Sequence, residues 1–336
     1  MQLYTTEKVT IPVRDGRTLP MLVIRHSENY RVRPQASDQS KHSDVQDRFE
    51  SSTAADGSTS IPGEAPIRHE KPEDRAIGVL WLHGGGYETG FPKLVIMSAG
   101  LELVRNFNVT LFVPDYRLSG TAPYPAALED AYDTLLYMKE NSRALDIRRS
   151  QLMVGGESAG GGLTAALCLY ARDKGEVNIA YQMPLYPMLD DRDTATNANN
   201  SGIFWNTRRN RAAWKKYLGP LYPKTAEDGH TLKKAELLAL IPSLSIPAYA
   251  VPARAKSLKK LPPCYTFIAK GEPFYAETVE YIKRLKTSGV PAHLDEYDVS
   301  EHAFDMMLPF LSESKRARAR FIKAFEFAMK RYSARN

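Results

Sequence analysis

The sequence predicts an α/β fold in which a mostly parallel sheet of about eight strands is flanked by helices and carries an inserted lobe. From residue 77 onward, short apolar runs rich in β-branched residues alternate with segments whose apolar residues recur at helical spacing. Such alternation is typical of parallel strands joined by crossover helices. One polar, proline-rich stretch, residues 190–261, interrupts it. We therefore predict a core formed by residues 1–189 and 262–336 and a cap or lid formed by residues 190–261.

The N-terminal part begins with strand-like sequence. Residues 8–13 and 19–24 are apolar and β-branched, as is the run 77–82 that opens the alternating region. Between them, residues 26–75 are rich in Ser, Asp, Glu, Arg and Pro. This tract holds too little apolar area to offset the entropy of ordering its backbone, which costs about 1–2 kcal/mol per residue. We predict a mobile surface insertion there, without a catalytic role.

The remaining elements follow in order along the chain. The predicted strands are residues 109–114, 151–155, 179–185, 265–269 and 292–297, and the predicted helices are residues 125–141, 159–173 and 276–288. The last of these helices ends where Gly289 can adopt the left-handed conformation of a C-cap. A helix-like aromatic stretch, residues 204–218, lies inside the predicted lobe, and residues 315–335 carry apolar side chains at helical spacing.

Composition excludes several classes of protein. The 43% hydrophobic and 25% charged residues are close to the average of soluble domains, which argues against a disordered or membrane protein. No apolar run reaches the roughly 18 residues of a membrane span, and the start lacks the apolar stretch of a secretory signal, so we expect a cytoplasmic protein. The charge of +6 is spread along the chain, which predicts no nucleic-acid partner. Cys168 and Cys264 are too few for a disulfide scaffold, and we expect both to be buried thiols.

The strongest local signal for chemistry is the run Gly156-Glu157-Ser158-Ala159-Gly160, between a predicted strand and a predicted helix. It matches the GxSxG pattern of a sharp strand-to-helix turn that presents a nucleophilic serine. Residues without bulk at the two flanking positions let the neighbouring chain approach. The first amides of the helix point at the reaction centre, so we expect the Ala159 N–H to bind an oxyanion. A small-residue turn that exists only for close packing is the alternative, and the flanking strand and helix argue against it.

A second signal, His83-Gly84-Gly85-Gly86-Tyr87, directly follows the strand that ends at Leu82. Glycines free the backbone to turn its amides inward, and an HGGG element in this place supplies oxyanion donors that complement the amide of the elbow. A phosphate-binding loop is disfavoured because neither a following Lys-Ser/Thr pair nor GxGxxG spacing is present. The predicted oxyanion donors are therefore Gly84, Gly85, Gly86 and Ala159, and the predicted substrate-binding side chains are His83, Tyr87 and Glu157.

A nucleophilic serine needs a base and an acid, and with a GxSxG elbow the chain order is nucleophile, acid, histidine. Of the seven histidines, His302 follows the last predicted strand and fits the base best, whereas His293 falls inside that strand, where we expect it to pack. The acid is expected on the loop after the preceding strand, where Glu272 stands. Glu277 is the alternative, but we expect it to lie on the exposed face of a helix.

With these motifs in place, the chain resembles the hormone-sensitive-lipase-like branch of the α/β-hydrolases, a family of esterases and lipases. The resemblance covers roughly residues 77–304 apart from the lobe, and it includes DYRL at residues 115–118 and PAALED at residues 125–130. It implies the α/β-hydrolase fold, a triad of Ser158, Glu272 and His302, and an oxyanion site at the HGGG glycines and Ala159. It also implies a small-molecule ester as substrate and no metal or organic cofactor.

The chain departs from the family pattern in ways that bear on the substrate. The family's acid is usually Asp, whereas Glu272 is longer by one methylene, and Asp is also usual where Glu157 stands. Family members often begin with helices that form part of the cap. Here the lid must come from residues 190–261, so we expect short acyl chains.

Other functions stay open at this point. An amide deacetylase or a lactone hydrolase could use the same triad. A non-catalytic small-molecule receptor, as in the plant gibberellin receptors that resemble this family, would lack the histidine that is present as His302. The choice between a monomer and a homo-oligomer is also left open.

Overall fold

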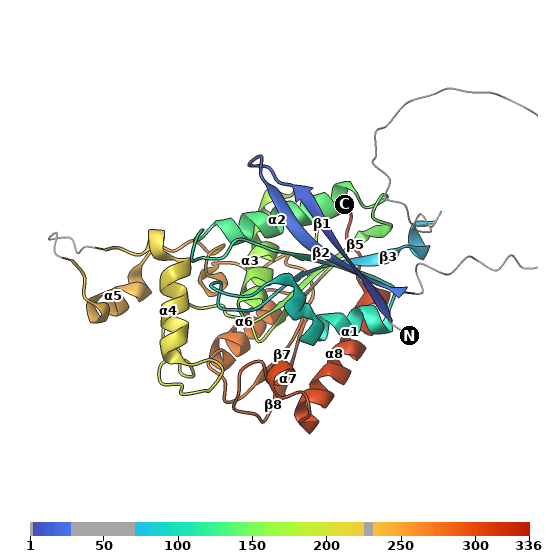
Figure 1. Cartoon of the computed structure of the whole chain (residues 1–336). Coiled ribbons are helices and arrows are strands. Elements are labelled where there is room, and N and C mark those ends of the chain that lie inside the picture. The colour runs from blue at the N-terminus through green and yellow to red at the C-terminus, as the bar shows by residue number, and fades with distance from the viewer. Residues whose placement is uncertain (1–2, 28–70, 225–230) are drawn as a thin grey trace, which may run out of the picture.

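The computed structural model describes residues 3–27, 71–224 and 231–336, which form one eight-stranded sheet with helices on both faces (Figure 1). The predicted α/β class and the number of strands are confirmed. Most of the predicted surface insertion, residues 26–75, lies outside the described residues. The described helices include none that is long and apolar enough to cross a membrane.

The sheet is antiparallel at one end and parallel elsewhere. Its strands lie in the order β1-β2-β4-β3-β5-β6-β7-β8, with antiparallel pairing of β1 with β2 and of β2 with β4. All pairs from β4 to β8 are parallel. The strands are β1 Tyr4–Pro12, β2 Thr18–His26, β3 Ala76–Leu82, β4 Val109–Pro114, β5 Ile147–Glu157, β6 Tyr181–Leu185, β7 Cys264–Ala269 and β8 Ala292–Tyr297.

Helices connect these strands. The α-helices are α1 Ala99–Asn106, α2 Ala126–Glu140, α3 Ala159–Lys174, α4 Thr207–Tyr217, α5 Lys234–Leu240, α6 Tyr275–Thr287, α7 Phe304–Met307 and α8 Ser312–Arg331. Five short 3-10 helices accompany them among the described residues: η2 Pro72–Asp74, η3 Pro92–Met97, η4 Gly219–Leu221, η5 Ile241–Ser243 and η6 Pro252–Arg254. α1, which the sequence analysis did not predict, packs against α8.

Alternation along β7 shows how the layers are built. Successive side chains of a strand point to opposite faces of the sheet. Tyr265 contacts Phe321 of α8, with 6.1 Å between the ring centroids. Its neighbour Cys264 faces the opposite layer, where Cys168 of α3 and Tyr281 of α6 are buried with it. Both cysteines are buried free thiols, as expected.

The helical spacing of apolar residues near the C-terminus does form a packed helix. In α8, Phe321 and Phe325 are buried while the basic residues of the helix lie largely on its exposed side. His293, however, does not pack inside the sheet as expected. Its side chain is 59% exposed, with Nε2 2.9 Å from Asp295 Oδ1. The reason is that β8 is the last strand of the sheet and leaves part of its surface open.

The strand register brings distant loops to one edge of the sheet. Leu82, the last residue of β3, pairs with Gly156 of β5. The ends of β5 and β6 pair through Glu157 and Leu185. Because these strands are parallel, the loops that follow their carboxyl ends meet at the same edge, which is where ligands bind in open α/β sheets.

Between β6 and β7, the described residues form α4, α5, η4, η5 and η6. The predicted helix 204–218 is α4, which begins later because the Asn206 side chain caps it by accepting a hydrogen bond from the Arg209 N–H at 3.1 Å. Figure 1 shows α4 and α5 (yellow to orange) on one side of the sheet, beyond the helices of the core.

Candidate active site

Ser158 lies at a sharp turn between β5 and α3. Its φ of 58° and ψ of −118° are rare for a residue with a side chain, and such strain persists only where the surrounding structure enforces it. The two flanking glycines show what enforces it here. A Cβ on Gly160 would lie 2.0 Å from the Leu82 carbonyl oxygen, and a Cβ on Gly156 would lie 2.4 Å from the same atom. The GxSxG spacing therefore reflects close packing of the elbow against the end of β3.

His302 lies on the loop after β8 and faces the serine. Its Nε2 is 2.8 Å from Ser158 Oγ, a normal hydrogen-bond length. Only 5% of His302 and 7% of Ser158 is exposed, so the pair is largely shielded from water. The structure thus brings together the two residues that the sequence analysis predicted as base and nucleophile.

Glu272 lies on the loop after β7, on the other side of the imidazole. Its Oε2 is 3.2 Å from His302 Nδ1. Burial raises the pKa of Glu272, whereas the charge of His302 and its hydrogen bonding lower it. The longer glutamate therefore reaches the histidine from this loop.

Glu277, the alternative acid, has a different environment from the one expected. It is 4% exposed, not on an exposed helix face, and its Oε1 accepts hydrogen bonds from the backbone N–H of Leu189 at 2.7 Å and of Asp190 at 3.3 Å. Sequence periodicity missed this because α6 is covered on that side by the segment that follows β6. Glu277 thus anchors the start of residues 190–261 to the core.

The glycine loop after β3 lies directly against the elbow. A Cβ on Gly84 would be 3.3 Å from Ser158 Cβ. Gly85 and Gly86 have φ values of +126° and +62°, which L side chains rarely adopt. Ala159 is the first residue of α3, so its N–H has no carbonyl partner within the helix. Gly84 and Ala159 therefore lie beside Ser158, and Gly85 and Gly86 continue the loop from Gly84.

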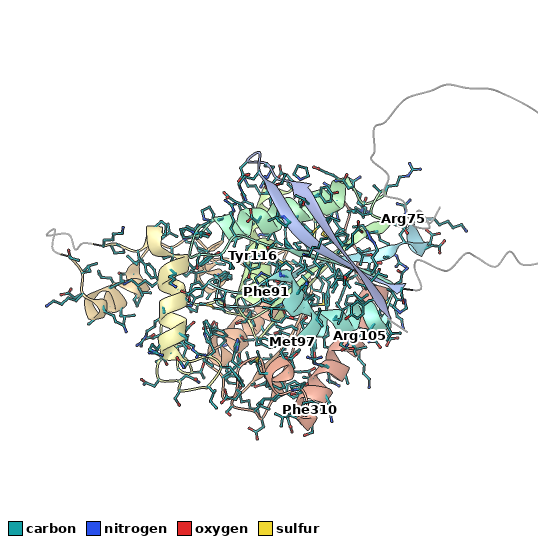
Figure 2. All side chains as sticks on the ribbon, viewed as in Figure 1. Arg75, Phe91, Met97, Arg105, Tyr116 and Phe310 are labelled. Carbon is teal, nitrogen blue, oxygen red and sulfur yellow. The ribbon has the colours of Figure 1, made fainter. Side chains whose placement is uncertain are left out.

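The three predicted substrate-binding side chains are instead engaged with protein groups. His83 stacks on Tyr116, labelled in Figure 2, with 4.2 Å between ring centroids, and Tyr116 donates its hydroxyl to the His83 carbonyl. Tyr87 stacks on Tyr217 of α4 at 3.9 Å. These contacts hold the His83 and Tyr87 rings beside Tyr116 and Tyr217, and the substrate-binding role of both residues stays a prediction.

Glu157 is also buried behind the elbow. Its Oε1 accepts a hydrogen bond from Trp81 Nε1 at 2.9 Å. Burial raises the pKa of Glu157 to about 8, so the carboxyl is mostly protonated near neutral pH. The contact of Glu157 with substrate stays a prediction.

Aromatic residues that the sequence analysis did not single out surround the histidine. Phe274 lies edge-on to His302 at 5.0 Å, and Trp205 lies 6.3 Å from it. Trp205 also covers the glycine loop, since a Cβ on Gly86 would be 2.4 Å from its ring. The only signal in the sequence was the aromatic character of the predicted lobe, which does not specify which ring meets the site.

The DYRL and PAALED segments meet outside the catalytic centre. Arg117 donates to both carboxylate oxygens of Asp130, which is fully buried, from its backbone N–H and its guanidinium. Arg17 of the β1–β2 turn region donates to the same carboxylate at 2.9 Å. These segments therefore hold the antiparallel end of the sheet to α2.

Among the described residues, no group of three or more His, Cys, Asp or Glu is arranged to hold a metal ion.

Comparison with known proteins places this geometry in a family. Residues 79–306 match a family model described as alpha/beta hydrolase fold. Esterase LipI of Mycobacterium tuberculosis is 29% identical over 245 residues, which are 72% of this chain and 68% of LipI. Carboxylic ester hydrolase LipN of the same organism is 32% identical over 259 residues, 73% of this chain and 63% of LipN. The matched region thus spans about two thirds of these relatives.

Solved structures agree with this match. A bacterial heroin esterase superimposes with a TM-score of 0.74 at 25% identity, covering 97% of this chain and 84% of that protein. The chain therefore belongs to the hormone-sensitive-lipase-like branch of the alpha/beta-hydrolase fold family, a family of carboxylic ester hydrolases.

Proposed function

We propose that this protein is a serine carboxylesterase that hydrolyses short-chain acyl esters through an acyl-enzyme on Ser158. The observation that carries the proposal is the chain of contacts Ser158 Oγ, His302, Glu272, with distances of 2.8 and 3.2 Å. A hydroxyl within hydrogen-bond reach of an imidazole whose other nitrogen meets a buried carboxylate is the arrangement that activates a serine.

In the first step, Ser158 Oγ attacks the carbonyl carbon of the ester while His302 Nε2 takes the hydroxyl proton. The carbonyl oxygen becomes an oxyanion. His302 then gives the proton to the leaving alcohol as the carbon–oxygen bond breaks, and an acyl-enzyme remains. In the second step, water attacks the acyl carbon with His302 again as base, and the acid leaves as Ser158 regains its proton.

The acid and the amides act on the charges that appear during these steps. Glu272 keeps Nδ1 of His302 protonated, so that Nε2 is free to accept, and it stabilises the imidazolium. The N–H groups of the glycine loop and of Ala159 bind the oxyanion. One such donor typically contributes on the order of 10²–10³ in rate.

Residues 190–261 act in this proposal as the cap. Trp205 comes from this segment, and its ring meets the glycine loop and His302. Trp205 and Phe274 lie next to each other, and together they place bulky rings beside the reaction centre. Bulk this close to the serine favours a short acyl group over a long one.

An amide deacetylase or a lactone hydrolase would use the same triad, and nothing in the described geometry favours either over an ester hydrolase. The receptor alternative is disfavoured because His302 is present and in contact with Ser158.

The test is a comparison of kcat/KM on p-nitrophenyl acetate, butyrate and decanoate with that on a matched anilide. We expect the acetate and butyrate to be cleaved fastest and the anilide slowest. Preference for the anilide would support an amidase instead, and no turnover of any ester would support a receptor.

A further inference from the structure

The loop that carries Trp205 is joined to the two loops that carry the triad acid and the triad base. This Trp205 loop, residues 200–205, lies before α4, and the Trp205 ring at its end lies 6.3 Å from the His302 ring. Polar contacts connect the loop to the residue that precedes Glu272 and to the residue that precedes His302. The position of the ring is therefore tied to both triad residues.

On the acid side, the Asn200 side chain makes the connection. Its Nδ2 donates a hydrogen bond to the carbonyl oxygen of Gly271, the residue before Glu272, at 3.0 Å. Its Oδ1 accepts a hydrogen bond from the backbone N–H of Gly202 at 2.9 Å, so the same side chain also shapes the turn of the loop. The start of the Trp205 loop is thus fixed to the backbone next to the triad acid.

On the base side, the connection is made by Glu301, the residue before His302. Its Oε2 accepts a hydrogen bond from the backbone N–H of Ile203 at 3.1 Å and a longer one from that of Phe204 at 3.5 Å. A carboxylate that accepts backbone N–H groups makes stronger hydrogen bonds than a neutral acceptor. Glu301 thus holds the backbone directly before Trp205.

These N–H groups do not need Glu301 in order to be satisfied. The Ile203 side chain is 73% exposed, so water has access to this part of the loop and would pair with the same donors. Because water replaces such a hydrogen bond when it breaks, the bond adds little to the stability of the whole fold. Its consequence is local: it fixes the conformation of the loop and the position of the ring that follows.

Close packing links the loop to that ring. A Cβ on Gly202 would lie 2.5 Å from the Trp205 carbonyl oxygen and 3.7 Å from Glu301 Oε2. At the other end of the contact, a Cβ on Gly86 would lie 2.4 Å from the Trp205 ring, and the Phe274 ring lies 6.4 Å from it. A shift of the loop therefore has to move the ring that lies beside the reaction centre.

We propose that Glu301 is a positioning residue that sets the preference for acyl length: it holds the Trp205 loop so that the Trp205 ring occupies the space that a longer acyl chain needs. This inference rests on the proposed function, in which Trp205 limits the acyl group beside Ser158. Glu301 acts through the loop and touches neither substrate nor the reacting atoms. Loss of its carboxylate should therefore change which ester is preferred more than how fast the acetate is cleaved.

The test compares Glu301→Ala with wild type on p-nitrophenyl acetate and decanoate. We expect the ratio of decanoate to acetate kcat/KM to rise about threefold, with kcat on the acetate within about twofold of wild type. The rise is smaller than that expected on removal of the Trp205 ring, because Asn200 still holds the loop. Glu301→Gln keeps an oxygen that accepts the same N–H groups, so it should restore most of the wild-type ratio.

Asp298→Ala is the matched control, since Asp298 is an exposed acid of the same loop after β8. It should keep the wild-type ratio. Gly202→Ala provides a second route that leaves the loop of His302 unchanged. Because its Cβ would press on the Trp205 carbonyl oxygen, we expect it to raise the ratio as Glu301→Ala does.

A double-mutant cycle tests whether Glu301 acts through Trp205. In Trp205→Ala the ring is already absent, so adding Glu301→Ala should change the ratio by less than about 1.5-fold. A coupling of this kind is not expected if Glu301 serves only the overall stability of the fold.

Acrylamide quenching of tryptophan fluorescence follows the loop without any ester. Trp81 and Trp214 are almost fully buried, whereas Trp205 is partly exposed. Glu301→Ala should therefore increase quenching in the wild-type background and leave it unchanged in Trp205→Ala.

Three results would overturn the inference while leaving the esterase intact. The first is an equal fall of kcat/KM on both esters in Glu301→Ala, which would mean that Glu301 serves the loop of His302 directly. The second is a change of the ratio that persists in Trp205→Ala, and the third is unchanged quenching in Glu301→Ala. If wild type itself cleaves no ester, the proposed function fails and the inference on acyl length fails with it; quenching then still decides whether Glu301 holds the loop.

Discussion

The loops at the carboxyl ends of the parallel strands and the side chains of residues 190–261 contribute to one site in different ways. The triad and the glycine loop follow paired strands, whose register fixes where each loop begins, as in the pairing of Leu82 with Gly156 and of Ala269 with Tyr297. Residues 190–261 instead reach the reaction centre through side chains such as Trp205. The difference suggests that the sheet sets the chemistry while this segment sets the substrate. Mutations in the two regions should therefore separate loss of kcat from change of preference.

The largest effect we predict from the sheet side concerns the acid. Glu272→Gln should lower kcat by about 10³-fold, because a neutral amide cannot stabilise the imidazolium and no longer fixes its tautomer. Glu277→Gln should instead keep kcat close to wild type, since Glu277 accepts the backbone N–H groups of Leu189 and Asp190, which the amide oxygen of Gln can also accept. Steady-state kinetics and thermal melts of both variants check this. A larger loss of kcat in Glu277→Gln would reverse the assignment.

The next prediction concerns the place where the two regions meet. Gly86→Ala should lower kcat about 10²-fold, because its φ of +62° is unfavourable for alanine and the new Cβ would lie 2.4 Å from the Trp205 ring. The control is Gly175→Ala at the end of α3, where φ is +70° and nothing lies within 4 Å. It should lose about 1 kcal/mol of stability and keep its kcat. Equal kcat values in the two variants would mean that the loop tolerates the change.

A smaller effect, on the preference for acyl length, is expected from a change within residues 190–261 alone. Trp205→Ala should raise the ratio of decanoate to acetate kcat/KM about tenfold, because it removes a ring that limits space beside the serine. Ile203→Ala, in the same loop but 73% exposed, should leave the ratio unchanged. An unchanged ratio in Trp205→Ala would show that acyl length is selected elsewhere, and the division between the two regions would fail.

The smallest effect on activity is expected at Glu157. In the folded protein its pKa is raised from 4.5 to about 8, so the fold favours the protonated acid. The resulting stability is fully present below about pH 4.5 and is lost as the pH rises through about 8. Glu157→Gln should therefore be more stable than wild type at pH 9 by up to a few kcal/mol, since one pKa unit corresponds to about 1.4 kcal/mol, with kcat within about twofold.

Urea unfolding at pH 6 and pH 9 measures this difference. Glu326→Gln, which replaces an exposed acid of α8 and leaves Glu157 in place, should keep the pH dependence of wild type. Equal pH dependence of stability in wild type and Glu157→Gln would contradict the buried, protonated state of Glu157.

Much of this architecture could be predicted because it is encoded locally. Apolar runs such as residues 77–82 and 109–114 are buried on both faces, so they are recognisable as strands without knowledge of their neighbours. The GxSxG and HGGG patterns reflect backbone contacts that only glycine allows, so their spacing located Ser158 and the glycine loop.

The features that were missed depend on contacts between distant segments. Glu277 was assigned to an exposed face because the helical pattern of α6 does not show that residues 189–190 cover it. Trp205 meets Gly86 across more than a hundred residues of chain, and no local pattern specifies that contact.

The central claim is that Ser158 is the nucleophile that becomes acylated. The most direct measurement is the intact mass of wild type and of folded Ser158→Ala after treatment with a fluorophosphonate, followed by peptide mapping. The account predicts one phosphonyl group on wild type, located on Ser158, with loss of esterase activity in proportion to labelling, and no label on the variant. Labelling at another serine, or ester cleavage by Ser158→Ala at the wild-type rate, would contradict it.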